Sequence, residues 1–542
     1  MDSDQILVLI PAIKKVVAFQ DDLVKRLNGI SLIQRSINLA NMLTNDKSTI
    51  YLFTDSEEIS LIADRNGINN LLEPKLLWNE DFFSTVVKKY LTGKTKNIYY
   101  TIIISPYAPL LTEEIINEAK LALENSKKDM LKPVTMIKRE VYSDNEKSIH
   151  DALFKNNVVQ HAVASNAFSL FKTELLNINY SNQVSTFSWP IEHDLLEIYS
   201  FQDWWVCEKI LKRKRIIFRV IGNIDDGMGH LYRALALAHD ITDHEILFIC
   251  DSDNEVAVNQ LAGYDYWLGV YEKNKIVENI IKLKPDLVIN DILSTKLEDV
   301  IPLKDIGIKV AGFEDLGPGA VYSDLIINEL YEINQVDGGN ILWGHHYFFL
   351  RDEFHDAVKH RFKNDIDEIL LAFGGTDQLN LSSIIFHSIR DVCKQKKIKI
   401  NIVTGPGYKN FKKLESAVKS DSLVLLTRST GVISSIMEKS QVAITSNGRT
   451  LYELAHLNIP AIVISQHKRE DSHEFACKEN GFIPIGIFKE GESEEKVLEE
   501  LTLLIEKKEY RKNLFEKLLK FEFHKTKKNV LKKLIELLPN EQ

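Results

Sequence analysis

The chain has 542 residues, too many for one hydrophobic core, and this length predicts about three to four structural units. Hydrophobic residues make up 44% and charged residues 27% of the chain, which excludes a disordered or fibrous protein. With 67 Lys and Arg against 77 Asp and Glu, the net charge of −10 gives no general attraction to nucleic acid or anionic membranes.

The first third alternates short apolar runs with helical patterns. Residues 6–10, 49–54 and 98–104 are apolar runs of strand length, and residues 30–44 and 56–66 have the spacing of amphipathic helices. This alternation predicts α/β layers around a parallel sheet.

A basic stretch at residues 209–215 predicts a domain boundary, after which the alternation starts again. Strands are expected at 216–221, 245–250, 286–290 and 308–313, and then at 368–373, 399–404, 422–426, 441–445 and 460–464. The tail 496–538 is amphipathic and rich in lysine. It predicts a packed helix pair, with a membrane-surface helix as the alternative.

The first residues of the chain and the spacing of its cysteines indicate in which cellular compartment the protein is expected. The acidic residues 1–5 do not resemble a signal peptide, and no run reaches the roughly 18 apolar residues that span a bilayer. The cysteines are widely spaced, which disfavours disulfides and a zinc ribbon: Cys207, Cys250, Cys393 and Cys477. We expect a cytoplasmic protein without membrane insertion.

Three glycine-bearing turns follow expected strands of the last two thirds, at residues 227–233, 373–377 and 446–453. Glycine lets backbone N–H groups approach a ligand closely, and the helix that follows favours an anion. Because ligands gather at the carboxyl ends of parallel strands, the three turns together predict a phosphate-bearing ligand.

These turns, in this order, resemble those of the two-lobed GT-B sugar-nucleotide enzymes. The resemblance is strongest to the UDP-sugar hydrolase of pseudaminic acid biosynthesis and the spore-coat polysaccharide proteins, and weaker to the transferase that adds N-acetylglucosamine to lipid I. Further matching segments are residues 244–250, 285–291, 314–316, 324–328 and 347–354. The resemblance implies an N-lobe over 214–355, a C-lobe over 365–490 and C-terminal helices over 496–542.

The resemblance also implies roles for individual residues. His230 would be the general base for attack on the sugar C1, and Glu453 would bind the ribose hydroxyls. The other implied nucleotide-binding residues are Gly227, Gly229, Arg233, Gly374, Gly375, Thr376, Ser446, Gly448 and Thr450. Asp291, Glu314 and Asp315 would bind the sugar and orient water. No metal is required, because helix N-termini and polar donors can neutralise a diphosphate.

Several positions depart from the family pattern, and they lie on the sugar side of the implied site. Leu293 stands where the hydrolases have tyrosine, Glu314 replaces the first of two aspartates, and Asn447 replaces glycine. Ser472-His473 occupy the stretch where the family has Asn-Gln.

Residues 5–210 resemble the sialic acid and Kdo cytidylyltransferases. The matching segments are residues 6–12, 53–59, 105–112 and 196–204. The resemblance implies a nucleotidyltransferase-like, GT-A-like domain over 1–211 and a homodimer through residues 1–210.

The residues that do the chemistry in those enzymes are altered here. Ile13–Val17 replace the glycine-containing triphosphate loop, Asp21-Asp22 replace a basic pair, and Glu197 and Tyr199 replace two Mg²⁺-binding aspartates. The acidic pair would repel phosphate, and the phenol of Tyr199 is a poor substitute for a carboxylate that binds Mg²⁺. These changes predict that the first lobe has lost catalysis. An active CMP-sugar synthetase is the alternative, and only then would Mg²⁺ be needed.

The sequence thus predicts an inverting hydrolase that releases UDP from a UDP-linked amino sugar in nonulosonic acid or surface polysaccharide biosynthesis. A GT-B glycosyltransferase is the runner-up. The third alternative is a non-catalytic scaffold that binds a nucleotide sugar.

Overall fold

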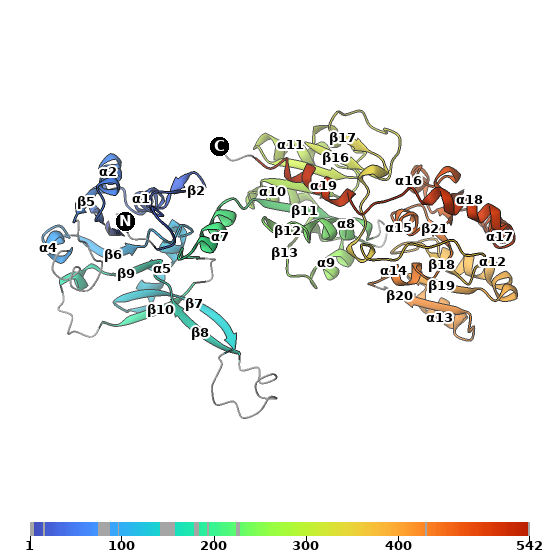
Figure 1. The fold of residues 1–542 in the computed structure, drawn as a ribbon, viewed down its shortest axis with the longest axis horizontal. Coiled ribbons are helices and arrows are strands. Elements are labelled where there is room, and N and C mark those ends of the chain that lie inside the picture. The colour runs from blue at the N-terminus through green and yellow to red at the C-terminus, as the bar shows by residue number, and fades with distance from the viewer. Residues whose placement is uncertain are drawn as a thin grey trace, which may run out of the picture. The chain divides into compact units, whose positions relative to one another are not determined.

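The structure is a computed structural model. It describes residues 5–14, 17–73, 87–95, 97–140, 158–177, 184–191, 195–223, 228–428 and 431–539. The chain forms two compact units, Met1–Arg213 and Lys214–Gln542, which are drawn together in Figure 1.

The first unit is built on an eight-stranded sheet with the order β10-β7-β9-β6-β1-β4-β5, and β8 pairs with β7. The central strands β6, β1, β4 and β5 run parallel, whereas β9 is antiparallel to β6 and β7. The strands are β1 (Gln5–Ala12), β4 (Ile50–Thr54), β5 (Asn69–Leu72), β6 (Ile98–Ile104), β7 (Met130–Glu140), β8 (Val158–Ala164), β9 (Phe168–Lys172) and β10 (Thr186–Pro190), with the short pair β2 (Arg26–Leu27) and β3 (Ile30–Ser31). The helices are α1 (Leu32–Leu43), α2 (Glu57–Asn66), α4 (Lys88–Leu91), α5 (Glu113–Ser126) and α7 (Phe201–Leu211).

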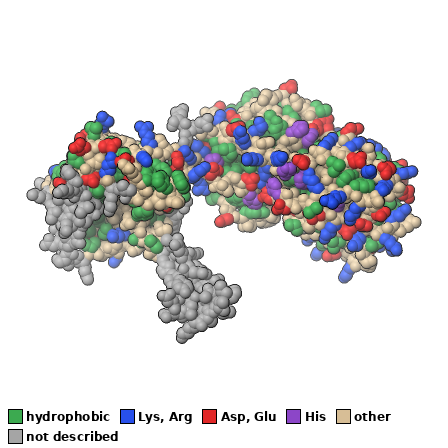
Figure 2. Space-filling model, in the orientation of Figure 1, with side chains coloured by type: hydrophobic (Ala, Val, Ile, Leu, Met, Phe, Trp, Pro, Cys, Tyr) green, Lys and Arg blue, Asp and Glu red, His purple; other side chains and the backbone are tan. Residues whose placement is uncertain are grey.

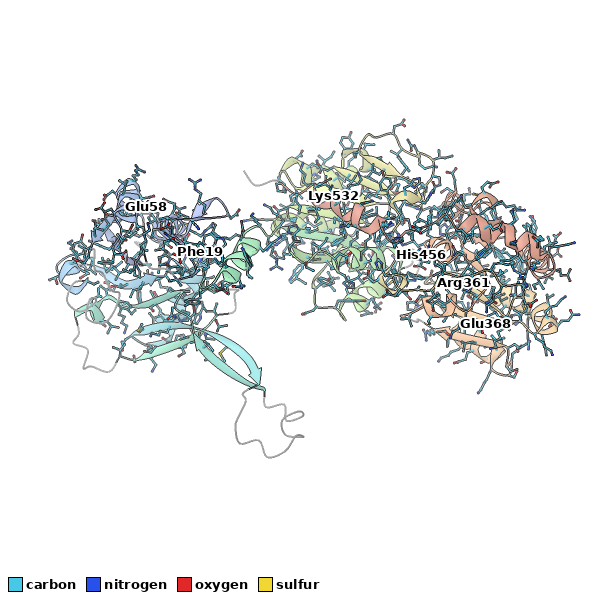
Figure 3. The ribbon with its side chains drawn as sticks, in the orientation of Figure 1. Phe19, Glu58, Arg361, Glu368, His456 and Lys532 are labelled. Carbon is cyan, nitrogen blue, oxygen red and sulfur yellow. The ribbon has the colours of Figure 1, made fainter. Side chains whose placement is uncertain are left out.

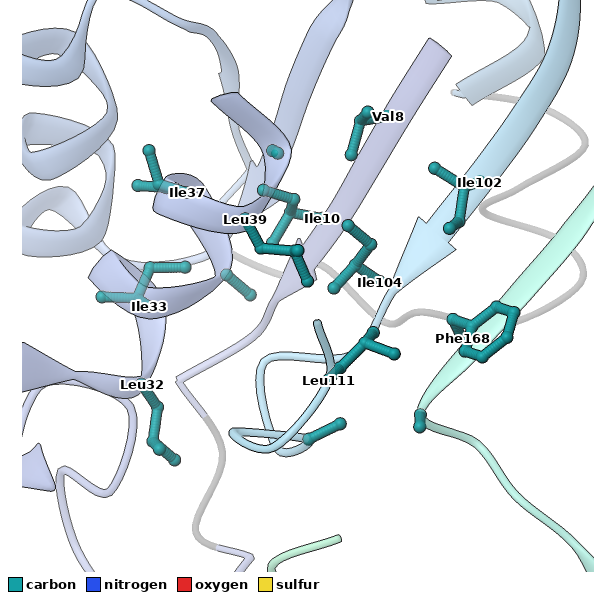
Figure 4. Close-up of a cluster of buried hydrophobic side chains, with 14 of the residues drawn as sticks. Val8, Ile10, Leu32, Ile33, Ile37, Leu39, Ile102, Ile104, Leu111 and Phe168 are labelled. Carbon is teal, nitrogen blue, oxygen red and sulfur yellow. The ribbon is translucent and has the colours of Figure 1, made fainter. Parts of the chain in front are cut away.

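Both faces of strand β1 are buried, as its unbroken apolar sequence requires. Val8 and Ile10 pack with Ile33 and Ile37 of α1, as Figure 4 shows. Leu7 and Leu9 pack on the opposite face. At the end of the unit, α7 is fixed by ring stacking between Phe201 and Phe19, whose centroids lie 4.4 Å apart; Phe19 is labelled in Figure 3.

The second unit has two parallel sheets, each with helices between its strands. The first sheet has the order β13-β12-β11-β14-β15-β16-β17 and defines the N-lobe. Its elements are β11 (Arg215–Val220), α8 (Gly229–Ala238), β12 (Glu245–Asp251), α9 (Glu255–Leu261), β13 (Trp267–Tyr271), α10 (Ile276–Lys282), β14 (Leu287–Asp291), α11 (Leu297–Asp305), β15 (Lys309–Phe313), β16 (Leu325–Asn328) and β17 (Ile341–Trp343).

The second sheet has the order β20-β19-β18-β21-β22-β23 and defines the C-lobe. Its elements are β18 (Glu368–Ala372), α12 (Leu381–Lys396), β19 (Lys399–Thr404), α13 (Phe411–Val418), β20 (Val424–Arg428), α14 (Ser434–Met437), β21 (Val442–Ser446), α15 (Thr450–His456), β22 (Ala461–Ser465), α16 (Lys468–Asp471) and β23 (Phe482–Ile487). The predicted α/β class with two Rossmann-type lobes is confirmed.

The tail forms three helices, α17 (Glu492–Glu506), α18 (Lys508–Leu518) and α19 (Thr526–Ile535), so the predicted helix pair is wrong. Leu501 of α17 and Leu514 of α18 join the core of the C-lobe. Val530 and Leu534 of α19 join the core of the N-lobe instead. The tail therefore ties the two lobes together rather than forming a layer of its own.

In both lobes the strand order reverses beside the first strand, between β11 and β14 and between β18 and β21. Such reversals open a crevice at the carboxyl ends of the strands, where α/β proteins bind ligands. The three glycine-bearing turns follow β11, β18 and β21, so the topology places them at these crevices.

Candidate functional site

A cavity of about 830 Å³ lies in the second unit at the two crevices. Ten of the predicted site residues line it: Gly229, His230, Glu314, Gly374, Gly375, Thr376, Ser446, Gly448, Thr450 and Glu453. Arg233, Asp291 and Asp315 do not line it and are each at most 1% exposed. Gly227 lies outside the described residues.

His230 begins α8 beside the buried carboxylate of Asp291. Its Nδ1 lies 2.6 Å from Asp291 Oδ1, at the end of strand β14. A carboxylate accepts a proton donor, so this contact fixes the imidazole with its hydrogen on Nδ1. The other ring nitrogen, Nε2, then carries a lone pair on a side chain that lines the cavity.

Arg233, one helical turn further along α8, holds Asp291 from the other side. Its Nε donates a 2.7 Å hydrogen bond to Asp291 Oδ2, and its Nη1 contacts both Glu314 and Glu329. Burial alone would raise the pKa of Asp291, but the charges of Arg233 and His230 outweigh it and lower that pKa. Asp291 is therefore ionised, and its contacts make it a positioning group rather than the sugar ligand that the sequence predicts.

Arg449 reaches from the third glycine turn of the C-lobe into the same buried cluster. Its guanidinium contacts Glu329 of the N-lobe and donates a 3.0 Å hydrogen bond to the Phe349 carbonyl. Burial, reinforced by the nearby Arg233, lowers the pKa of Arg449 to about 10. The guanidinium is charged at neutral pH and links the third glycine turn to the cluster around His230.

Asp315 holds a loop rather than a ligand. Its carboxylate accepts hydrogen bonds from the Thr295 hydroxyl at 2.5 Å and from the backbone N–H of Gly317 at 2.8 Å. A Cβ on Gly317 would lie only 2.2 Å from the Thr295 carbonyl, so this close approach requires glycine. The predicted contact between Asp315 and the sugar is not made by this geometry.

Glycine-bearing turns form the C-lobe side of the cavity. Gly374 has a φ of +80°, a left-handed conformation that favours glycine. A Cβ on Gly405, in the loop after β19, would lie 2.2 Å from the Gly375 carbonyl oxygen. Gly405 therefore supports the turn from behind, a role that no sequence pattern indicated.

Opposite His230, the C-lobe brings further polar groups to the cavity near α16. Burial raises the pKa of Glu470 to about 7, and its Oε2 accepts a 2.7 Å hydrogen bond from the Gln466 N–H. His473 Nδ1 lies 2.7 Å from the Asn447 carbonyl, and burial lowers the pKa of this histidine. The sequence marked Ser472-His473 and Asn447 only as departures, and the structure places His473 and Glu470 in the cavity lining.

Sequence reasoning also missed Arg351, Glu353 and Glu329. Glu329 lies directly after strand β16 and is fully buried. A charged residue next to an apolar strand was the one feature of the sequence that could have identified it. Arg351 and Glu353 lie in the matching segment 347–354, but no spacing linked them to Glu453, whose Oε1 accepts a 2.8 Å hydrogen bond from Arg351 Nε.

In the first unit, a carboxylate of the protein itself accepts the backbone donors of the turn that stands where the cytidylyltransferases have their triphosphate loop. Asp22 accepts hydrogen bonds from the N–H groups of Val17 and Ala18 at 3.2 and 3.1 Å, and from the Tyr107 hydroxyl at 2.9 Å. Residues 15 and 16 of the predicted loop lie outside the described residues. The backbone donors at this turn are therefore turned towards a carboxylate of the chain itself.

The predicted metal position in this unit is similarly engaged. Glu197 Oε1 accepts 2.8 Å hydrogen bonds from the Ser165 hydroxyl and the Asn166 N–H, and its Oε2 accepts one from the Tyr199 hydroxyl. These donors occupy three of the roughly four lone-pair sites of the carboxylate, which weakens it as a ligand for Mg²⁺. Within the described ranges, no group of three or more His, Cys, Asp or Glu residues is placed to hold a metal ion.

The surface carries both signs of charge. Figure 2 shows acidic and basic side chains interspersed over the visible face of each unit. None of the helices in the described part of the chain is long and apolar enough to cross a membrane.

The sequence of the chain is similar to those of two other proteins. No family model matches it. It is 29% identical over 266 residues to an uncharacterized protein of Methanocaldococcus jannaschii, covering 46% of this chain and 54% of that protein. It is 25% identical over 271 residues to the spore coat polysaccharide biosynthesis protein SpsG of Bacillus subtilis, covering 47% and 79%. The chain thus spans about half the length of the first relative and is homologous, over about half of itself, to a spore coat polysaccharide protein.

Among solved structures, MurG of Acinetobacter baumannii is similar in fold at 13% identity, with a TM-score of 0.43, over 60% of this chain and 99% of that protein. The resemblance of the first unit to cytidylyltransferases stays a prediction.

Proposed function

We propose that the second unit binds a UDP-sugar and cleaves the bond between the sugar C1 and the diphosphate. The observation that carries this proposal is the pair of His230 and Asp291 at the edge of a cavity lined by three glycine-bearing turns. The homology to a spore coat polysaccharide biosynthesis protein supports a sugar substrate.

In the proposed reaction, His230 Nε2 takes the proton of an attacking hydroxyl whose oxygen forms a bond to C1. The C1–O bond to the diphosphate breaks at the opposite face, so the configuration at C1 inverts. Asp291 stabilises the imidazolium and keeps the hydrogen on Nδ1. The turns around Gly374 and Gly448 would receive the departing diphosphate, since helix N-termini and backbone donors favour an anion.

Water is the attacking group in the leading version, which makes the protein a UDP-sugar hydrolase. A glycosyltransferase is the second candidate, and one observation favours it. The cavity lining also includes Gln260 and Tyr264 of the N-lobe, which belong to none of the three glycine-bearing turns. An acceptor hydroxyl would have room there.

Incubation with a panel of UDP-sugars, with and without Mg²⁺, tests the proposal by the release of UDP. UDP without an added acceptor supports hydrolysis, and UDP only after an acceptor is added supports transfer. His230→Gln should bind UDP-sugars normally and turn over about 10²–10⁴-fold more slowly. If the wild type binds UDP-sugars tightly and does not turn them over, the alternative of a non-catalytic scaffold is supported instead.

For the first unit we propose an assembly or regulatory role without nucleotidyl transfer. The support is the occupation of the turn at Val17 and Ala18 by Asp22, and of Glu197 by protein donors. The nonulosonic acid branch, the cytoplasmic location and a homodimer through residues 1–210 stay predictions.

A further inference from the structure

The segment that links the two lobes contributes a charged pair to the cavity. Arg351 and Glu353 both line it, with Arg351 Nη1 3.0 Å from Glu353 Oε1. On its other side, Arg351 Nε donates a 2.8 Å hydrogen bond to Oε1 of Glu453. We propose that Arg351 is a positioning residue that orients the Glu453 carboxylate and so sets how strongly the site recognises the ribose hydroxyls of its nucleotide. This inference rests on the proposed function, which assigns Glu453 to the ribose.

The contact leaves half of the Glu453 carboxylate for a ligand. Arg351 takes Oε1, and Oε2 remains for the ribose hydroxyls. The Glu453 side chain is only 5% exposed, so an unpaired charge there would be costly to bury. Burial opposes the charge on Arg351, but Glu453 and Glu353 outweigh it and raise the pKa of the guanidinium. Arg351 is thus a fixed cation that holds the Glu453 carboxylate in one orientation.

The pair of Arg351 and Glu353 also contacts the C-lobe segment that leads into α14. Glu353 Oε2 accepts a 3.1 Å hydrogen bond from the Ser434 N–H, at the start of α14. Gly431 and Ile433, just before it, line the cavity. The guanidinium carbon of Arg351 also lies 5.9 Å from the ring centroid of Tyr232 in the N-lobe. One arginine therefore touches the carboxylate assigned to ribose, the link and both lobes.

If Arg351 contacted the ligand directly, replacing it would lower the affinity for every nucleotide alike. If it acts through Glu453, replacing it lowers the affinity only for nucleotides that carry the ribose hydroxyls. The two roles are separated by the ratio of the affinities for UDP and for its 2′-deoxy and 3′-deoxy analogues. A merely structural role in folding would not move this ratio.

Calorimetry should be run on the full chain and on Arg351→Gln, Arg351→Lys, Glu453→Gln and the double variant Arg351→Gln/Glu453→Gln. The wild type should prefer UDP to a deoxy analogue by about tenfold or more, the effect of a charge-assisted hydrogen bond. Glu453→Gln should remove most of this preference, and Arg351→Gln should remove most of it as well. Arg351→Lys should keep part of it, and the double variant should be no worse than Glu453→Gln.

The matched control is Arg390→Gln, because Arg390 makes a similar 3.0 Å contact with Asp421 in the C-lobe without lining the cavity. It should leave the ratio unchanged. If Glu453→Gln collapses the ratio and Arg351→Gln does not, the positioning role is refuted while the proposed function stands. If UDP fails to bind, or Glu453→Gln leaves the ratio intact, the ribose assignment fails and this inference with it. Arg351→Lys supplies the readout if Arg351→Gln does not fold.

Discussion

Replacing Asp291 with asparagine tests the contact on which the proposed chemistry depends, because the substitution preserves the size of the side chain. Asp291 Oδ1 lies 2.6 Å from His230 Nδ1. In Asp291→Asn, the amide NH₂ can donate to Nδ1, which moves the imidazole hydrogen to Nε2. An imidazole with its hydrogen on Nε2 cannot accept a proton from the attacking hydroxyl at that atom.

The expected loss of turnover is the loss of general-base catalysis, about 10²–10⁴-fold in kcat. UDP affinity should stay nearly constant, since Asp291 does not line the cavity. Breaking a buried ion pair typically costs about 3–5 kcal/mol of the free energy of unfolding. We expect a smaller cost, because Arg233 keeps its contacts with Glu314 and Glu329.

The stability difference has a defined pH dependence. The folded pKa of Asp291 lies below its ordinary value, so ionised Asp291 stabilises the fold above the unfolded pKa of about 3.9. This contribution is lost as the pH falls through the folded pKa. The difference between wild type and Asp291→Asn should therefore be constant above about pH 5 and shrink in acid.

The assay is UDP release at saturating UDP-sugar, with calorimetric UDP binding and thermal unfolding on the same samples. Asp299→Asn is the control, because Asp299 accepts a 2.8 Å hydrogen bond from Arg219 in the same lobe without lining the cavity. It should reduce stability and leave kcat unchanged. An Asp291→Asn protein that turns over at the wild-type rate would refute the role of the pair.

Three further predictions follow from single positions or from the first unit. Gly405→Ala should weaken UDP binding in calorimetry, because its Cβ would meet the Gly375 carbonyl at 2.2 Å. Gly339→Ala should not, because no atom lies within 4 Å of the added Cβ and Gly339 does not line the cavity. Burial raises the pKa of Glu470 to about 7, so the wild type should lose stability relative to Glu470→Gln as the pH rises from about 4.5 to 7. A difference in Tm that is flat over this range would contradict the burial of that charge. The full chain should release no pyrophosphate from CTP and a nonulosonic acid, with or without Mg²⁺, and detectable release would refute the assignment of the first unit.

Most of the expected strands agree closely with the structure because they are short apolar runs that both faces of a parallel sheet bury. Residues 245–250, for example, form most of β12 (Glu245–Asp251). The edge strand β20, expected at 422–426, is only partly buried and begins two residues later. The gathering of the glycine turns also followed from the sequence, since parallel strands end at one edge. The tail was harder, because an amphipathic pattern does not reveal which core each helix covers, and α19 packs on the lobe opposite to α17.

The roles of the acidic residues could not be read from the sequence. The end of β14 lies beside β11, with Asp291 paired in register with Val220, and this follows from the strand order. Which carboxylate faces the cavity, however, depends on the side-chain donor that reaches each one. Arg233 takes Asp291 from α8, whereas Thr295 takes Asp315, and neither contact has a periodic signature.

Glu329 explains why the two sides of the site are held together. Its Oε1 lies between Arg233, which also holds Asp291, and Arg449, which belongs to the third glycine turn. Glu329 and the Arg233 side chain are both 0% exposed, so neither can exchange its partner for water without opening the lobes. Separation of the lobes would remove Arg449 and leave Glu329 with Arg233 alone. The position of the third glycine turn and the orientation of the His230–Asp291 pair are therefore coupled through one buried carboxylate.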